Sequence, residues 1–130
     1  MDDCVSHPAT AIVLFGHGSR DTRWTEPFEA IRTAVERLTP GSAVRLAYLE
    51  HSPPALDAAV GELAAGGHRR IDLVPLFLGA GGHVRRDIPE QAATAAAAHG
   101  VEVRVRPFIG EAAAVTDAIA AHVAATVGGS

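Results

Sequence analysis

The sequence has 130 residues, 48% of them hydrophobic and 20% charged, a composition typical of one compact folded domain and not of a disordered chain. Its formal net charge of −4 provides no general basic field, so we expect neither nucleic acid nor a membrane as a partner. The single cysteine, Cys4, excludes an intramolecular disulfide framework and a multi-cysteine metal site. Because the N-terminus is acidic and no apolar run approaches about 18 residues, the sequence predicts a cytoplasmic protein.

Short apolar runs alternate with segments of helical spacing along the chain. The first run ends at Gly16 and is typical of a strand buried on both faces, and the following helical segment has Pro27 in its first turn. Ser52 and two prolines are expected to open the second helix, and Pro89 the third. In chain order, the predicted elements are strand 11–15, helix 25–38, strand 43–49, helix 52–65, strand 71–78, helix 89–99, strand 101–105 and helix 111–127.

This alternation predicts an α/β fold. Strands separated by helices imply right-handed crossovers, so we expect a single doubly wound domain with a four-stranded, mostly parallel sheet and helices on both faces. The domain is expected to span residues 1–130, with residues 1–9 as a flexible N-terminal tail. Pro75 lies inside the third predicted strand and is a local objection, since proline usually marks a sheet edge or a bulge.

Three side chains that can bind a metal follow three different strands. His17 follows the first strand, Glu50 ends the second, and His83 lies in the loop after the third, with 33 residues between successive members. In open parallel sheets, ligands bind outside the carboxyl ends of the strands, where the strand order reverses. A strand order of 2-1-3-4 would bring the three together. Two imidazoles and a carboxylate suit a borderline divalent metal ion and leave coordination positions open.

Each of these residues also has an ordinary structural interpretation. A lone histidine after a strand is more often a hydrogen-bonding loop residue than a ligand, and Glu50 alone can cap the next helix. The glycines of Gly16-His17-Gly18 and of the segment 79–82 favour the functional interpretation, because they keep both loops open to a ligand. His51, beside Glu50, either lines the pocket or faces solvent.

Four arginines follow the same strand ends and can grip carboxylates or phosphates by bidentate hydrogen bonds. They are Arg20, Arg23, Arg85 and Arg86. For Arg23 and Arg86 a solvated surface position is an equally good interpretation. Ser19, Arg20 and Arg85 are the predicted contacts to a carboxylated substrate.

The ordered set of motifs resembles the short CbiX/SirB-type sirohydrochlorin chelatases, a class II chelatase family. It covers roughly residues 10 to 110, and the matching segments are 14–20 (LFGHGSR), 47–50 (AYLE), 74–78 (VPLFL) and 82–89 (GHVRRDIP). The resemblance implies that Co(II) or Fe(II), as substrate and not as a resident cofactor, is inserted into sirohydrochlorin on the way to cobalamin or siroheme. It also implies that no prosthetic group is needed and that chains this short pair as homodimers.

The chemistry assigned to the three residues agrees with that implication. Insertion of a divalent metal into a macrocycle expels two pyrrole protons, so a site needs metal ligands and proton acceptors. His17 and His83 are predicted to serve as both, with Glu50 as a ligand or proton relay. The segment 111–127 is apolar on most sides, which favours burial against a second copy.

Two other functions stay open from the residues. One is a non-catalytic carrier of metal or tetrapyrrole on the same fold, since a fold alone does not give a function. The other is a phosphoryl-transfer enzyme with His17 as nucleophile and the nearby arginines as phosphate contacts. The second is weaker, because Gly16 occupies the place where such an enzyme needs an arginine and Glu50 has no role in it.

Overall fold

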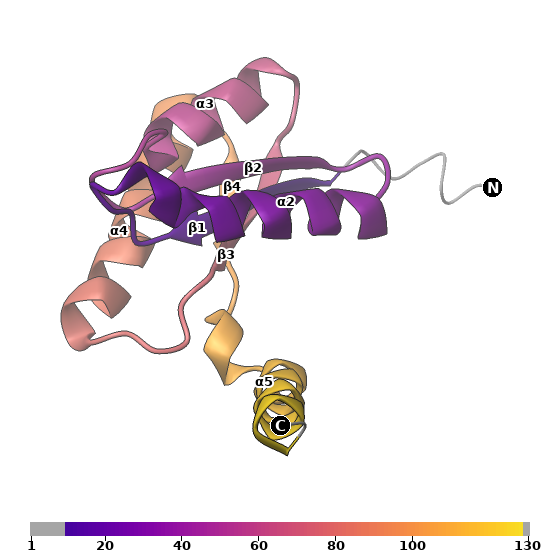
Figure 1. Ribbon diagram of the computed structural model, residues 1–130. Coiled ribbons are helices and arrows are strands. Elements are labelled where there is room, and N and C mark those ends of the chain that lie inside the picture. The colour runs from indigo at the N-terminus through magenta and orange to yellow at the C-terminus, as the bar shows by residue number, and fades with distance from the viewer. Residues whose placement is uncertain (1–9, 129–130) are drawn as a thin grey trace.

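A computed structural model describes residues 10–128, whose strands form one sheet flanked by helices (Figure 1). The expected flexible tail, residues 1–9, and Cys4 lie outside the described residues. Two short 3-10 helices, labelled η, accompany the longer helices. The elements are β1 (Ala11–Gly16), η1 (Thr22–Thr25), α2 (Glu26–Leu38), β2 (Ala43–Tyr48), α3 (Leu56–Ala65), β3 (Arg70–Pro75), α4 (Gly82–His99), β4 (Glu102–Val105), η2 (Ile109–Glu111) and α5 (Ala113–Gly128).

The sheet has the strand order β2-β1-β3-β4, and all three neighbouring pairs are parallel. The α/β, doubly wound prediction and the order on which the predicted site depends are therefore confirmed. The central pair, β1 and β3, lies at the point where the strand order reverses. Loops that follow these two strands leave from the same edge of the sheet, which is where ligands bind in folds of this kind.

Each face of the sheet carries its own apolar core, because alternate residues of a strand point to opposite faces. On one face, Phe15, Ile71 and Leu73 are fully buried under α3 and α4. On the other, Leu14 and Leu46 are buried beside α2. Helices thus cover both faces, as predicted.

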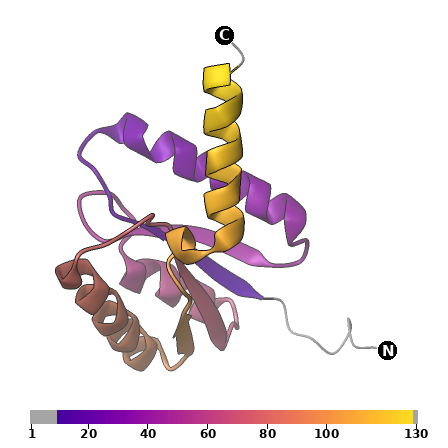
Figure 2. The same ribbon diagram turned by 90° about the horizontal axis from the view of Figure 1, so that it is seen from below.

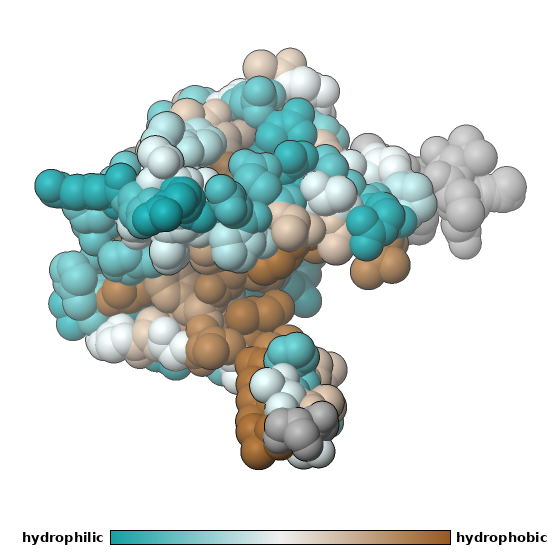
Figure 3. Space-filling view, in the orientation of Figure 1, coloured by the Kyte–Doolittle hydropathy of each residue, from teal (hydrophilic) through white to brown (hydrophobic). Residues whose placement is uncertain are grey.

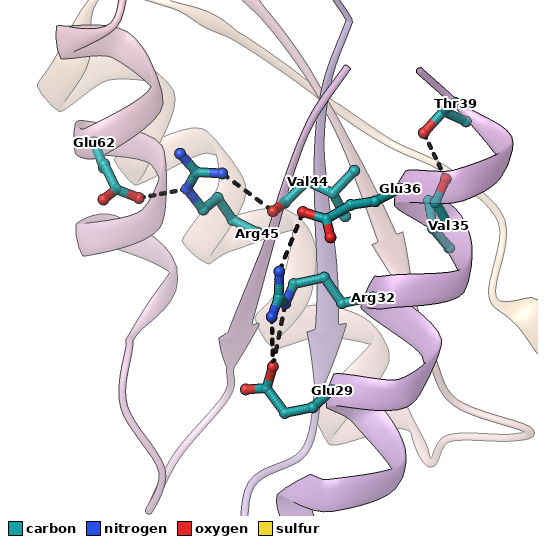
Figure 4. Close-up of polar contacts among 8 residues, drawn as sticks. All are labelled: Glu29, Arg32, Val35, Glu36, Thr39, Val44, Arg45 and Glu62. Carbon is teal, nitrogen blue, oxygen red and sulfur yellow. Dashed lines mark hydrogen bonds and ion pairs between the residues drawn. The ribbon is translucent and has the colours of Figure 1, made fainter. Parts of the chain in front are cut away.

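Helix α2 and the sheet are also linked to their surroundings by charged pairs at the surface (Figure 4). Arg32 donates to Glu29 at 2.9 Å and to Glu36 at 3.1 Å, which are its neighbours at helical spacing. Arg45 of β2 donates to Glu62 of α3 at 2.7 Å. The Arg32 pairs lie within α2, the Arg45–Glu62 pair joins β2 to α3, and such exposed pairs add little stability individually.

The third strand and the helix after it differ from the sequence-based boundaries. β3 ends at Pro75 and α4 already begins at Gly82, so Pro89 lies inside the helix and does not open it. Burial decides this start, because Ile88 is fully buried and Val84 packs against the same core one turn earlier. Burying these two side chains outweighs the backbone hydrogen bond that an internal proline removes.

Pro75 sits at the end of a central strand. Leu76 donates its backbone N–H to Phe15 on the β1 side, and Arg106 donates to Leu73 on the β4 side, both at 2.8 Å. Successive residues of a parallel strand turn alternately to the two neighbours, so the proline nitrogen faces β4 just where that strand ends at Val105. The next hydrogen bond of the ladder would need an N–H on residue 75 to donate to the Arg106 carbonyl, so the proline ends the pairing of β3 with β4 at Val105.

Two other predicted boundaries are wrong by a few residues. The helix expected to open at Ser52 begins at Leu56, because two consecutive prolines and their turn precede it. The segment expected as one helix over 111–127 is divided into η2 and α5. Gly110, in the middle of η2, passes so close to Leu78 that an added Cβ would lie 1.9 Å from the Leu78 carbonyl oxygen.

Helix α5 projects away from the sheet instead of covering it (Figures 1 and 2). Its large apolar side chains are exposed, with Ile119 at 44% and Val123 at 53%. The face of the sheet beside α2 is consequently open over β3 and β4, and apolar surface shows both there and along α5 (Figure 3). An open groove on this face is lined by Thr10, Ile12, Asp72, Val74, Arg104 and Arg106.

In the described part of the chain, residues 10–128, no helix combines the length and the apolar character that crossing a membrane requires.

Candidate functional site

The first two predicted site residues meet at the carboxyl edge of the sheet. β1 and β2 pair in register up to Gly16 and Tyr48, so the two strands end level with each other. His17 follows β1 directly and Glu50 lies two residues beyond β2. The Nε2 atom of His17 is 3.5 Å from Oε2 of Glu50, and both side chains are about half exposed.

The two loops are held together by their backbones. Leu49 donates to the carbonyl of Gly16 at 2.9 Å, and Glu50 donates to the carbonyl of His17 at 3.1 Å. Gly18, with φ +99°, passes so close to Glu50 that a Cβ on it would lie 1.6 Å from the Glu50 carbonyl oxygen. Only glycine fits this crossing, and it fixes the position of His17 relative to Glu50.

A pair of serines continues this connection. The backbone N–H of Ser19 donates to Oγ of Ser52 at 3.0 Å, and the same hydroxyl donates to the Ser19 carbonyl at 2.8 Å. The Ser19 hydroxyl accepts a hydrogen bond from the backbone of Asp21 at 3.1 Å. Ser19 therefore lies beside the site, as predicted, and its contact with a substrate stays a prediction.

The atoms of His17 and Glu50 that face each other are both electron-pair donors. Nδ1 of His17 contacts the carbonyl oxygen of Gly18 at 3.2 Å, and a carbonyl only accepts, so the tautomer that makes this hydrogen bond carries its proton on Nδ1. In the neutral ring, Nε2 then presents its lone pair to the Glu50 carboxylate. A cation between the two atoms, either a proton or a metal ion, satisfies both of them.

His83 is not part of this pair. It lies in the first turn of α4 and not in a loop as predicted, since the helix starts at Gly82. Its Nε2 is 3.1 Å from Oδ2 of Asp87, one turn along, and its side chain is 82% exposed. Among residues 10–128, no three His, Cys, Asp or Glu side chains are grouped so that they could hold a metal ion.

The predicted arginines have different surroundings. Arg20 is directed to the site, where its Nε donates to Nδ1 of His51 at 3.4 Å. Arg85 is held on the other side of the edge by three contacts. Its guanidinium lies 4.7 Å from the ring centre of Phe108, contacts Glu111 at 3.3 Å and donates to the Ala80 carbonyl at 3.2 Å.

Some neighbours of the site are not predicted by the sequence pattern. Phe77, just after β3, contacts the ring of His17 edge-on with 6.3 Å between ring centres, so the β3 loop reaches the site through this aromatic residue. Of the two positions that the sequence left open for His51, the structure shows the one beside the site, with Nε2 3.7 Å from Oε2 of Glu50. Asp87 pairs with His83. A spacing of four residues predicts a contact between two side chains only within a helix, and the sequence pattern predicts that His83 lies in a loop.

The Glu50 carboxylate argues against a phosphohistidine mechanism. A phosphoryl group that approaches Nε2 of His17 would meet a negatively charged oxygen that lies 3.5 Å from that nitrogen. Transfer to a histidine needs positive charge around the incoming phosphate, and here the nearest charged partner has the wrong sign. The same carboxylate favours a bound cation.

Comparison with known proteins gives consistent results. The family model that matches residues 11–126 is CbiX. A sirohydrochlorin cobaltochelatase from Methanopyrus kandleri is 38% identical over 80 residues, which are 62% of this chain and 56% of that protein. The chain thus spans little more than half the length of that relative.

Three solved structures have the same fold. A protein from Marinobacter aquaeolei VT8, named as a CbiX protein of cobalamin (vitamin B12) biosynthesis, is 34% identical with a TM-score of 0.85, and the match covers 93% of this chain and 99% of that one. SirB from Bacillus subtilis subspecies spizizenii in complex with cobalt and SirB from Bacillus subtilis with Fe3+ are each 25% identical, with TM-scores of 0.69 and 0.79. The matches cover 78% and 92% of this chain, and 44% and 48% of theirs.

The family match includes every described strand and the two loops that carry His17 and Glu50. It agrees with the sheet order and with the motif segments of the sequence. The chain therefore belongs to the CbiX family.

Proposed function

We propose that this protein is a sirohydrochlorin chelatase that inserts Co(II) or Fe(II), its metal substrate, into the tetrapyrrole. The observation that carries the proposal is the convergence of two lone-pair donors, Nε2 of His17 and Oε2 of Glu50, at the carboxyl edge of the sheet. The names of the relatives and the cobalt and Fe3+ bound by the SirB structures support this metal chemistry. A cytoplasmic location is part of the proposal, because a reducing compartment keeps iron ferrous.

Each residue of the proposed site has a chemical task. Insertion exchanges two pyrrole protons for one M²⁺, so the products are the metallated macrocycle and two protons. His17 delivers the metal through Nε2, and the Glu50 carboxylate binds it from the other side and accepts a departing proton. His83 is proposed as the third ligand, and it has to exchange its contact with Asp87 for the metal. The glycine segment before it leaves open space around its backbone.

Anaerobic mixing of the protein with sirohydrochlorin and Co(II) or Fe(II), followed by absorption spectroscopy, tests this proposal. Insertion is expected to exceed the metal-only background, and His17→Ala or His83→Ala is expected to reduce the enzyme-dependent rate by about 100-fold. Glu50→Gln keeps the size but loses the charge, so it should lower turnover more than tetrapyrrole binding.

His68→Ala is the matched control, because His68 precedes β3 and so lies at the opposite edge of the sheet. It should leave insertion nearly unchanged. Binding of metal and tetrapyrrole without turnover would identify a carrier, and wild-type turnover in both His17→Ala and His83→Ala would refute the assigned site.

The substrate carboxylates are proposed to bind Ser19, Arg20 and Arg85. The double variant Arg20→Ala/Arg85→Ala is expected to raise the dissociation constant for sirohydrochlorin about 10-fold or more, because charged hydrogen bonds are lost. Added salt should weaken wild-type binding in the same direction. Arg37→Ala, an exposed arginine in the last turn of α2, serves as the control. Unchanged affinity in the double variant would remove both arginines from the substrate site.

A homodimer is part of the proposal, with α5 of one copy lying on the sheet of the other. The open groove beside α2 has apolar walls in Ile12 and Val74, and α5 exposes Ile119 and Val123. The charges are also complementary. In the groove, Arg104 lies 3.8 Å from Asp72, which leaves Arg106 as the cation for Asp117, the single charged residue of α5. A helix in that place would give the sheet the second cover that doubly wound folds have.

A further inference from the structure

His51 has an unusual backbone. With φ 69° it is the one non-glycine residue with positive φ among residues 10–128. The chain around it is firmly held, since Ser52 donates its backbone N–H to the Glu50 carbonyl at 2.8 Å and its hydroxyl binds Ser19. A left-handed conformation is unfavourable for residues other than glycine and asparagine, and it persists where surrounding contacts impose it. Here it turns an imidazole back onto Glu50.

The contacts of the ring define its protonation. The Nε of Arg20 donates to Nδ1 of His51 at 3.4 Å, and an arginine has no acceptor, so this Nδ1 carries the lone pair. In the neutral ring the proton is therefore on Nε2, which lies 3.7 Å from Oε2 of Glu50, a contact longer than a hydrogen bond. Both nitrogens of His51 thus have a partner. The contacts form one sequence, from Arg20 through His51 and Glu50 to His17.

We infer that His51 is a positioning residue whose Nε2, 3.7 Å from Oε2 of Glu50, keeps the Glu50 carboxylate near His17. Metal sites commonly depend on such outer contacts, which orient the groups that bind the ion. Glu50 is half exposed, and the Nε2 atoms of His17 and His51 approach the same oxygen, Oε2, at 3.5 and 3.7 Å, so His51 limits how far the carboxylate can rotate away from His17. The activity measurement that tests this inference rests on the proposed function. Co(II) binding tests the inference without it.

Two variants separate the ring from the backbone. His51→Asn suits the left-handed backbone but is too short to reach Glu50, whereas His51→Gln strains the backbone and places an amide N–H near the position of Nε2. A positioning role predicts that His51→Asn lowers kcat for Co(II) insertion about 10-fold, with little change in KM for sirohydrochlorin. His51→Gln should keep a kcat much closer to that of the wild type. If His51 had only a structural role, kcat would be lower in His51→Gln than in His51→Asn. Urea unfolding should show that His51→Asn is the more stable variant, because it suits the left-handed backbone.

Co(II) binding in the absence of tetrapyrrole, followed by visible absorption, completes the experiment. The inference requires that His51→Asn binds Co(II) more weakly than His51→Gln does. Both variants should lose less Co(II) affinity than His17→Ala. Equal losses of Co(II) affinity in all three variants would identify His51 as a metal ligand and overturn the inference. Wild-type insertion activity in His51→Asn, or lower activity in His51→Gln than in His51→Asn, would also overturn it. If the wild-type protein inserts no metal, the proposed function fails, and the Co(II) affinities still decide the role of His51.

Discussion

Tyr48 shows how a single buried polar atom affects this fold. Its ring packs against those of Trp24 and Phe28 on the α2 face of the sheet. Its hydroxyl is the one buried side-chain N or O atom in residues 10–128 without a hydrogen-bond partner. A buried group that has lost its water and found no partner costs free energy. Burial also raises the pKa of Tyr48, because the phenolate is less well solvated there.

Tyr48→Phe is therefore expected to raise the free energy of unfolding by about 1 kcal/mol near neutral pH. Because the pKa is higher in the folded state, the contribution from protonated Tyr48 is complete below the unfolded value of about 10 and is lost as pH rises beyond it. The advantage of the Phe variant should grow above that pH. Urea unfolding of the wild type and Tyr48→Phe, at neutral pH and above about pH 10, measures this difference in stability. A Tyr48→Phe variant no more stable than the wild type at the higher pH would contradict the prediction.

At the scale of elements, the crossing of the β1 and β2 loops decides whether the site exists. Gly18 touches the carbonyl of Glu50, and the backbones of the two loops are joined by hydrogen bonds on either side of it. These contacts set the distance between His17 and Glu50 without using either side chain. A change at Gly18 should therefore alter both the stability of the fold and the metal site.

Gly18→Ala is expected to lower the free energy of unfolding by about 2 to 4 kcal/mol, combining a left-handed backbone with a clash against main chain. Co(II) binding should weaken with it. Gly41→Ala is the matched control, since Gly41 has a similar φ of +88° but nothing within 4 Å of an added Cβ. Its cost should be about 1 to 2 kcal/mol, from the backbone alone. Equal losses in the two variants would show that the crossing is not tight.

At the scale of the whole molecule, α5 and the open sheet face have complementary properties. Sedimentation velocity at micromolar concentration is expected to show a dimer, and Ile119→Glu/Val123→Glu to shift it to monomer, because charges would be buried in an apolar contact. Ala114→Glu/Ala121→Glu adds the same charge on the opposite side of the helix and should leave the dimer intact. A wild-type monomer with full insertion activity would refute the dimer.

The sequence by itself determined the four strands and their alternation with helices, and it offered the order 2-1-3-4, which the structure has. Apolar runs such as residues 11–15 and the regular alternation with helices are local signals, and the crossover rule for parallel strands then leaves few arrangements. From that topology, His17, Glu50 and His83 were predicted to meet. The structure brings the first two within 3.5 Å of each other and places His83 beside Asp87. The family resemblance rests on the same motifs and is confirmed.

Only the tertiary structure decided where α4 begins, what His51 contacts and where α5 goes. Proline signals favour a helix start at Pro89, but burial of Ile88 extends the helix back to Gly82 and places His83 beside Asp87. The proposed role of His51 depends on its left-handed backbone, with φ 69°, and the residues next to it in the sequence do not predict that conformation. In each case, contacts between residues distant in the sequence outweigh local preference, and such contacts are not encoded in any short segment.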